Sequence, residues 1–68
     1  MQKYKAVFHV VEGDISYFQE PEYFDAESDE VAKLFAQQKL QYKGSMRVKC
    51  TLWGLFRVLQ QEIVESVE

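Results

Sequence analysis

The feature that most constrains this fold is a pair of alternating segments with one helical segment between them. In residues 3–12, and again in residues 45–53, apolar or aromatic side chains recur at every second position. A period of two with β-branched and aromatic residues is typical of strands that bury one face. Both segments are therefore predicted to be strands. Their apolar faces consist of Tyr4, Ala6, Phe8 and Val10 in the first, and of Met46, Val48, Cys50 and Leu52 in the second.

A short turn predicts that the first strand continues into a hairpin. Gly13, within the turn at residues 12–14, can adopt the positive φ that a tight turn often requires. Residues 15–18 are predicted to form the second strand, and the sequence leaves open whether it extends to Phe24. Pro21 cannot donate to a ladder, so it predicts an edge, a bulge or the end of that strand.

The helical segment has a recognisable start and end. Ser28 is predicted to cap the N-terminus, because its hydroxyl can accept a bond from an unpaired backbone N–H. Asp29 and Glu30 follow in the first turn, where the helix dipole favours negative charge. Gly44 is predicted to terminate the helix. The apolar stripe at helical spacing consists of Val31, Leu34, Phe35, Gln38 and Tyr42, with Leu40 off the stripe.

The tail at residues 55–67 is the ambiguous part of the chain. Gln60, Gln61 and Glu62 favour a helix over a strand, and we predict a short C-terminal helix. Continuation of the preceding strand through residues 57–59 stays open as an alternative. The helical stripe of the tail consists of Leu55, Phe56, Leu59, Ile63 and Val67.

These elements predict one α+β domain spanning residues 1–68. The expected architecture is a three-stranded antiparallel sheet in the order β-β-α-β, with one helix packed on a face and a short C-terminal helix. The other face of the sheet is expected to be open to water or to a partner. That face is predicted to carry Lys5, His9, Thr51 and Trp53.

Length and cysteine usage bound the stability and the compartment. A chain of 68 residues buries little surface, so a partner or a second copy would add to its burial. Cys50 is the only cysteine and cannot form an internal disulfide. A free thiol, no leader-like N-terminus and no apolar run of about 18 residues predict a cytoplasmic protein without a membrane span.

No catalytic constellation can be assembled from this sequence. His9 is the only histidine, and no second ligand lies at a metal-binding spacing from it. Cys50 alternates with apolar neighbours and is expected to pack as a small hydrophobic side chain. The three glycines are isolated, so no phosphate-binding loop is predicted. We expect a protein that is not an enzyme and that uses no metal or cofactor.

The net charge of −3 conceals an uneven distribution. Eight of the eleven acidic residues lie between Glu12 and Glu30, with four aromatic residues but no lysine or arginine among them. An acidic and aromatic surface can steer towards a basic partner and then anchor on it. The alternative is a solvated acidic edge that blocks aggregation. Trp53 is predicted either to anchor a partner or to be covered by the C-terminal helix.

The run from Phe24 to Ala32, an aromatic residue followed by A-E-S-x-E-x-A, resembles small phage and plasmid accessory proteins. In its layout the chain looks like the small phage protein that inhibits bacterial RNA polymerase. In element order and acidity it is similar to the small phage inhibitor of uracil-DNA glycosylase, which mimics DNA. The resemblance covers residues 4–53 and implies a host inhibitor, without specifying binding residues.

The leading hypothesis is therefore a non-enzymatic inhibitor or modulator that occupies a basic or nucleic-acid-binding surface of a host protein. The residues predicted to bind that partner are Glu20, Glu22, Tyr23, Asp25, Glu27 and Trp53. The first alternative is a homodimer that associates through the apolar stripe of the tail. The second is weak nucleic-acid binding by the open sheet face, which the net acidity disfavours. That alternative would use Lys5, Arg47, Lys49 and Trp53.

Overall fold

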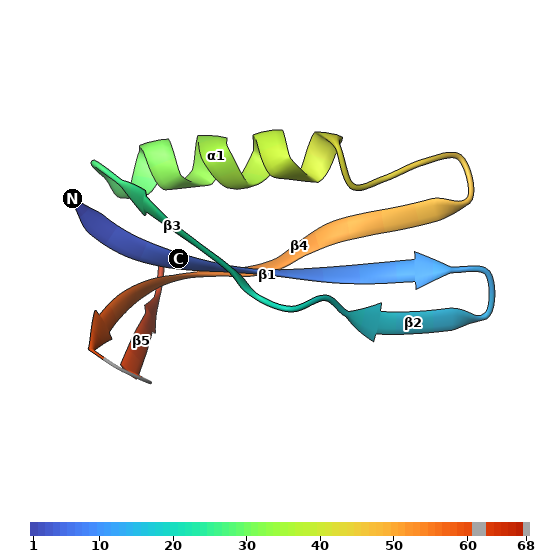
Figure 1. Ribbon diagram of the computed structural model, residues 1–68, viewed down its shortest axis with the longest axis horizontal. Helices are drawn as coiled ribbons and strands as arrows, with labels where there is room; N and C mark the ends of the chain where they lie inside the picture. The colour runs from blue at the N-terminus through green and yellow to red at the C-terminus, as the bar shows by residue number, and fades with distance from the viewer. Residues whose placement is uncertain (61–62, 68) are drawn as a thin grey trace.

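The computed structural model describes residues 1–60 and 63–67, which form a curled antiparallel sheet with a single helix on one side (Figure 1). The elements in chain order are β1 (Gln2–Glu12), β2 (Ile15–Phe18), β3 (Glu22–Ala26), α1 (Asp29–Gln41), β4 (Val48–Gln60) and β5 (Ile63–Ser66). No helix within these residues combines the length and the apolar character that a membrane span requires.

β1 is the central strand of the sheet. Along one edge its second half pairs with β2 and its first half pairs with β3, while its other edge pairs with β4. β5 pairs with the last part of β4, and every pairing is antiparallel. The predicted hairpin after β1 is confirmed, with Gly13 at a φ of 60°.

The predicted second strand is interrupted at Pro21, which separates β2 from β3. A proline has no N–H to donate, so the ladder along this edge of β1 cannot be continuous. The Gln19 amide still donates to the Phe8 carbonyl at 3.0 Å, which keeps the connecting segment close to β1. β2 and β3 therefore act as two halves of one edge strand.

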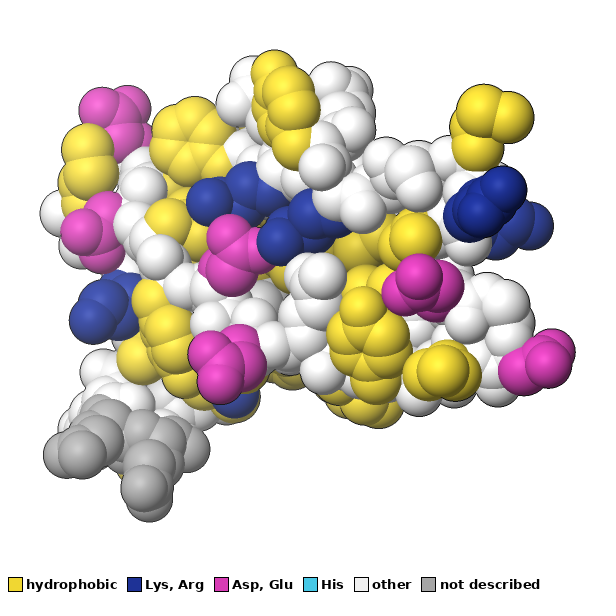
Figure 2. Space-filling view, turned by 45° about the vertical axis from the view of Figure 1, so that its right-hand side comes forward, with side chains coloured by type: hydrophobic (Ala, Val, Ile, Leu, Met, Phe, Trp, Pro, Cys, Tyr) yellow, Lys and Arg dark blue, Asp and Glu magenta, His cyan; other side chains and the backbone are white. Residues whose placement is uncertain are grey.

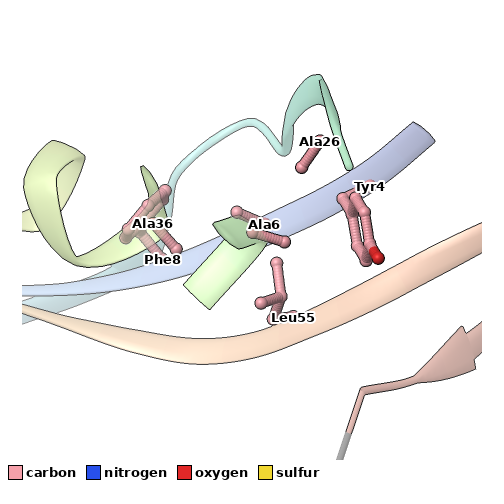
Figure 3. Close-up of a cluster of buried hydrophobic side chains, with 7 residues drawn as sticks. Tyr4, Ala6, Phe8, Ala26, Ala36 and Leu55 are labelled. Atoms are coloured by element: carbon pink, nitrogen blue, oxygen red, sulfur yellow. The ribbon is translucent and has the colours of Figure 1, made fainter. Parts of the chain in front are cut away.

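The core lies between the sheet and α1, and the alternation of β1 decides which side chains enter it. Tyr4, Ala6 and Phe8 are almost completely buried on the helix side (Figure 3). Leu55 from β4 and Ala36 from α1 close the same cluster. This confirms the apolar face predicted for the first strand.

The face of α1 that packs on the sheet differs from the prediction. Leu34, Phe35 and Tyr42 of the predicted stripe are 58%, 40% and 89% exposed, so the stripe prediction is wrong. The buried positions are Ala32 and Ala36, one turn apart and without exposed surface. Small side chains at this spacing let the helix lie close to the sheet. Val31 and Leu40 pack against the rim of the core.

The ends of α1 were predicted with mixed success. Ser28 is the N-cap as expected, and its hydroxyl accepts from the Val31 amide at 3.2 Å. The helix ends earlier than predicted, with Tyr42 rather than a residue next to Gly44 at the C-cap. Gly44 does not adopt a positive φ, so its predicted role as the stop signal is wrong.

The predicted three-stranded sheet with a C-terminal helix is wrong. Residues 55–60 continue β4, and residues 63–66 form β5, which pairs back on β4. Gln61 and Glu62, which helped to favour the helix, lie outside the described residues. The strand prevails because Ala6 and Lys5 of β1 pair with residues 55 and 56, and a helix there would leave this edge of β1 unpaired.

A polar network at one end of the core holds β5 and α1 to the sheet. The Tyr4 hydroxyl donates to Asp29 Oδ1 at 2.6 Å, and Arg57 forms ion pairs with both Asp29 and Glu65. The hydrogen bond to Asp29 raises the pKa of Tyr4, and the bond to Glu65 raises the pKa of Arg57. One guanidinium therefore joins the start of α1 to β4 and β5.

Candidate binding surface

The face of the sheet opposite α1 carries no covering element among the described residues, and we call it the open face (Figure 1). Successive side chains of a strand point to opposite faces, so the β1 residues between the buried ones lie here. Residues of β2, β3 and β4 that are paired with these β1 residues lie on the same face. The open face thus carries Lys3, Lys5, Val7, His9, Val11, Ser16, Phe18, Tyr23, Asp25, Lys49, Thr51 and Phe56.

Aromatic rings from three strands meet on the open face. The ring of Phe18 lies 4.8 Å from that of His9 and 5.4 Å from that of Trp53, the latter in an edge-to-face arrangement. Trp53 lies 6.4 Å from Phe56. Phe18 and Trp53 remain 56% and 62% exposed. We call these four residues the aromatic cluster. Its rings are in contact with one another and still accessible to a partner.

A bulge in β4 explains the position of Trp53. Val7 of β1 pairs with Gly54 and Phe8 pairs with Leu52, so Trp53 is the extra residue. A bulge bends the strand and re-aims a side chain. Here the re-aimed indole lies between the rings of β2 and of the second half of β4. Of the two alternatives for Trp53, the structure shows the uncovered one: the side chain is 62% exposed, and no helix lies over it within residues 1–60 and 63–67.

Gly54 lets the ring of Phe56 lie close to the strand. A β-carbon added at Gly54 would lie 2.7 Å from Phe56 Cε2 and 2.8 Å from Cζ. Such separations are far below van der Waals contact, so any larger residue would displace the ring. The missing side chain at Gly54 therefore shapes the surface that the aromatic cluster presents.

The charges on the open face have the opposite sign to the chain as a whole. Lys5 lies in one row with Tyr23 and Phe56, and Lys49 is paired with Val11. Lys3 is paired with Asp25, the acidic residue that register places on this face. The residues that alternation and register place here therefore carry three lysines and one aspartate. The molecule is acidic, but its open face is locally basic.

The structure divides the six predicted site residues between different parts of the surface. Tyr23 and Asp25 lie on the open face, as does Trp53. Glu20 is exposed in the link between β2 and β3, and Glu27 is exposed after β3. Glu22 lies on the helix side, with α1.

The acidic stretch does not form one continuous surface in this fold. Glu22 forms ion pairs with Lys39 and Lys43, chiefly through Lys43, which lowers the pKa of Glu22. Asp29 is paired with Arg57. On the side seen in Figure 2, acidic side chains are scattered among apolar and basic ones. Strand alternation sends neighbouring acids to opposite faces, and the helix and β4 supply counter-charges.

Besides His9, two residues of the aromatic cluster were not among the predicted site residues: Phe18 and Phe56. Phe56 was assigned to the helical stripe of the tail, so its face was misjudged. Phe18 was counted only among the aromatics of the acidic stretch. The signal that could have found Phe18 was the alternation of strand residues combined with the hairpin register at Gly13, which pairs His9 with Phe18.

His9 lies on the open face and Cys50 on the helix side, so these two side chains are on opposite faces of the sheet. Within residues 1–60 and 63–67 no three His, Cys, Asp or Glu side chains are grouped to hold a metal ion. Cys50 lies half-buried on the helix side, and burial raises the pKa of its thiol. A raised pKa lowers the thiolate fraction and hence the reactivity of the thiol.

A hollow lies between α1 and the strands β4 and β5, and its lining also includes Trp53 and Phe56 of the aromatic cluster. Its volume is about 260 Å³. Lys33 and Gln37 of the helix form one wall, and apolar residues of β4 and the end of β5 form the floor. The floor includes Leu52, Leu55 and Val67. The hollow borders the outer edge of β4.

Comparisons with family models, with curated proteins and with solved structures find no match to this chain.

Proposed function

We propose that this protein is a small non-catalytic binding module whose open face takes single-stranded nucleic acid. The observation that carries the proposal is the accessible aromatic cluster on an uncovered sheet face beside Lys5 and Lys49. Proteins that hold single strands combine aromatic rings, on which bases stack, with cations that follow the phosphates.

The exposed indole and phenyl rings supply the stacking component. Trp53 and Phe18 are each more than half exposed, and their edge-to-face contact leaves ring faces free. Tyr23, 57% exposed and in the row of Lys5, adds a further ring towards β3. Stacking on rings needs no particular base, so the proposal is for binding with weak sequence preference.

Local charge supports a polyanion over a second copy at this face. Stacking two open faces would bring lysines from both copies into one apolar interface, where like charges are unfavourable. A phosphate backbone would instead neutralise Lys5 and Lys49. The overall charge of −3 predicts modest affinity, because the rest of the molecule repels the same polyanion.

The test is a titration with a fluorescein-labelled oligothymidine, followed by anisotropy at low and at moderate salt. Binding should weaken as salt rises, and Lys5→Gln with Lys49→Gln should reduce that salt dependence. Trp53→Ala should weaken binding roughly 5- to 150-fold, because one stacked base contributes about 1–3 kcal/mol. Tyr42→Ala is the matched control, since Tyr42 is 89% exposed on the helix and away from the cluster.

Two results would overturn the proposal. One is no binding at low salt, and the other is a Trp53→Ala variant that binds as tightly as the wild type. Capture of an acidic protein at the same face, abolished by Trp53→Ala, would assign the surface to a protein partner instead.

The phage-type host inhibitor is the second candidate function. The observation in its favour is that Glu20, Asp25 and Glu27 are exposed around Tyr23. Reversing these three acids to lysine should abolish salt-sensitive capture of a basic host protein, and unchanged capture would remove this candidate. Glu22 is left out of the test because its ion pairs with the helix support the fold.

A cytoplasmic location accords with either function. Cys50 is a free, half-buried thiol, as is usual where the environment is reducing. Both proposed partners, a nucleic acid or a protein that handles one, are found there.

A further inference from the structure

The outer edge of β4 is partly unpaired. β1 covers the inner edge of β4 from Val48 to Arg57, but β5 covers the outer edge only from Phe56 onwards. Next to this pairing, the Val67 amide donates to the Leu55 carbonyl at 3.0 Å. At the other end, Ser45 and Val48 exchange backbone bonds of 2.9 and 3.3 Å. Between these two points, residues 49–54 have no strand partner on the outer side in the described parts of the chain.

The backbone groups that point outwards can be identified by alternation. Both backbone groups of Val48 are used by Ser45, so Val48 turns its N–H and C=O away from β1. Backbone direction alternates along a strand, so Cys50 and Leu52 also turn theirs outwards. The bond from Gln19 to the Phe8 carbonyl agrees independently. The backbone N–H and C=O of Phe8 point towards β2 and β3, so the backbone groups of its partner Leu52 do not point towards β1.

We propose that two copies of this chain pair edge to edge through β4, antiparallel, around a two-fold axis at Thr51. In this register Cys50 of each copy lies opposite Leu52 of the other, and the four outward groups of each copy form four hydrogen bonds across the axis. The sheet then continues from one copy into the next, with both open faces on the same side.

A register with the two-fold axis at Cys50 would also keep both open faces on the same side, but the same backbone geometry excludes it. An axis at Cys50 would place Leu52 opposite Val48 of the second copy, whose backbone groups already bond to Ser45. The axis at Thr51 uses only groups that lack a partner within the described chain. The edge is therefore complementary to itself in one register, which favours a second copy over an unrelated peptide.

Side chains on both faces suit this pairing. On the open face the two Thr51 side chains meet at the axis, a favourable cross-strand pair, and Lys49 lies opposite Trp53 of the second copy. On the helix side Val48 of the second copy lies just past Leu52, beside the hollow that Leu52 and Leu55 line. A neighbouring chain would therefore close a hollow that is otherwise open.

The opposite edge of the sheet offers no comparable strand. It is broken at Pro21 between β2 and β3, and Glu20 is exposed at the break. Proline and charge at an edge are features that block strand addition. On β4, the bulge at Trp53 ends the regular edge after Leu52, which limits the pairing to a short segment.

Sedimentation equilibrium at tens to hundreds of micromolar tests the proposal, and the wild type should show a dimer. Thr51→Glu should shift the protein to monomer, because two carboxylates would face each other at the axis. Ser16→Glu is the matched control: it adds the same charge to an exposed open-face position on β2, and it should leave the dimer intact. Far-UV circular dichroism checks that both variants fold.

A crosslink gives a second, positive readout. In a Cys50→Ala background, Thr51→Cys should oxidise to a disulfide dimer, since the two positions form a non-hydrogen-bonded pair with Cα atoms about 4.5 Å apart. Ser16→Cys in the same background should not crosslink at a similar rate. A wild-type monomer throughout this range, without the Thr51→Cys crosslink, would overturn the proposal. So would a dimer that survives Thr51→Glu, because the copies would then meet elsewhere.

Discussion

The helix face that packs on the sheet can be tested by enlarging Ala36. This residue has no exposed surface and lies between α1 and the core residues of β1 and β4. Ala36→Leu inserts three further carbon atoms into a close-packed interface, which costs about 1–3 kcal/mol. A 68-residue domain at about 0.05–0.15 kcal/mol per residue has only about 3–10 kcal/mol of stability. The single substitution should therefore remove a large share of it.

Leu34→Ala on the same helix is the matched control. Leu34 is 58% exposed, so its truncation should change the free energy of unfolding by less than about 0.5 kcal/mol. Urea unfolding followed by far-UV circular dichroism gives both values. Thermal unfolding gives an independent estimate, with about 4–8 °C expected per kcal/mol for a domain of this size.

The two substitutions should also rank in one order, with Ala36→Leu destabilising the protein more than Leu34→Ala. The sequence pattern alone buries Leu34 and exposes Ala36, and the structure reverses both positions. If Leu34→Ala destabilised the protein more than Ala36→Leu, the helix would be rotated about its axis relative to the structure. The packing argument would then be refuted.

Three other changes test separate features. The pKa of Glu22 is lowered from its ordinary value of 4.5, chiefly by Lys43. The ionised Glu22 therefore stabilises the fold above pH 4.5, and this contribution is lost as the pH falls through the lower folded-state pKa. Glu22→Gln should flatten the acid side of a plot of urea midpoint against pH. An unchanged slope would count against the ion pair. Ser28→Ala should lower the free energy of unfolding by about 1 kcal/mol while Ser28→Asp preserves it, and equal urea midpoints for both variants and the wild type would contradict the cap. Gly54→Ala should displace the ring of Phe56 and shift the NMR signal of the neighbouring indole, and an unmoved signal would show that the ring does not lie on the glycine.

The local features that were predictable from the sequence are those fixed by nearest neighbours. Alternation located β1 and the first half of β4, Gly13 located the hairpin, and Ser28 located the start of α1. Each of these signals acts within a few residues and needs no knowledge of the rest of the fold. They therefore survive in the structure, except that β4 begins at Val48 and leaves Met46, predicted on its apolar face, fully exposed.

The features that failed depend on which elements meet. A stripe of large apolar residues predicted the wrong helix face, because the close approach of helix and sheet selects Ala32 and Ala36. The tail became strand because the free edge of β1 offered pairing to residues 55–57, a tertiary effect that outweighs helix propensity.

The candidate site was predictable only in part for a related reason. Trp53 and Tyr23 were predicted to bind a partner, and the structure leaves both side chains exposed. Counting charges along the chain combined Glu22 with Asp25, although strand alternation places them on opposite faces. Phe56 joined the surface only once its segment was known to be a strand.

The central position of β1 has a consequence for the order of folding. Ala6 meets Glu22 soon after it along the chain, but it meets Leu55 only near the far end. A growing chain can therefore close the β1–β3 ladder early, yet it must hold the other edge of β1 unpaired until β4 has been synthesised. Until then the apolar face of β1 lacks its β4 neighbours. The period before β4 arrives is the time at which this protein is most exposed to misassociation.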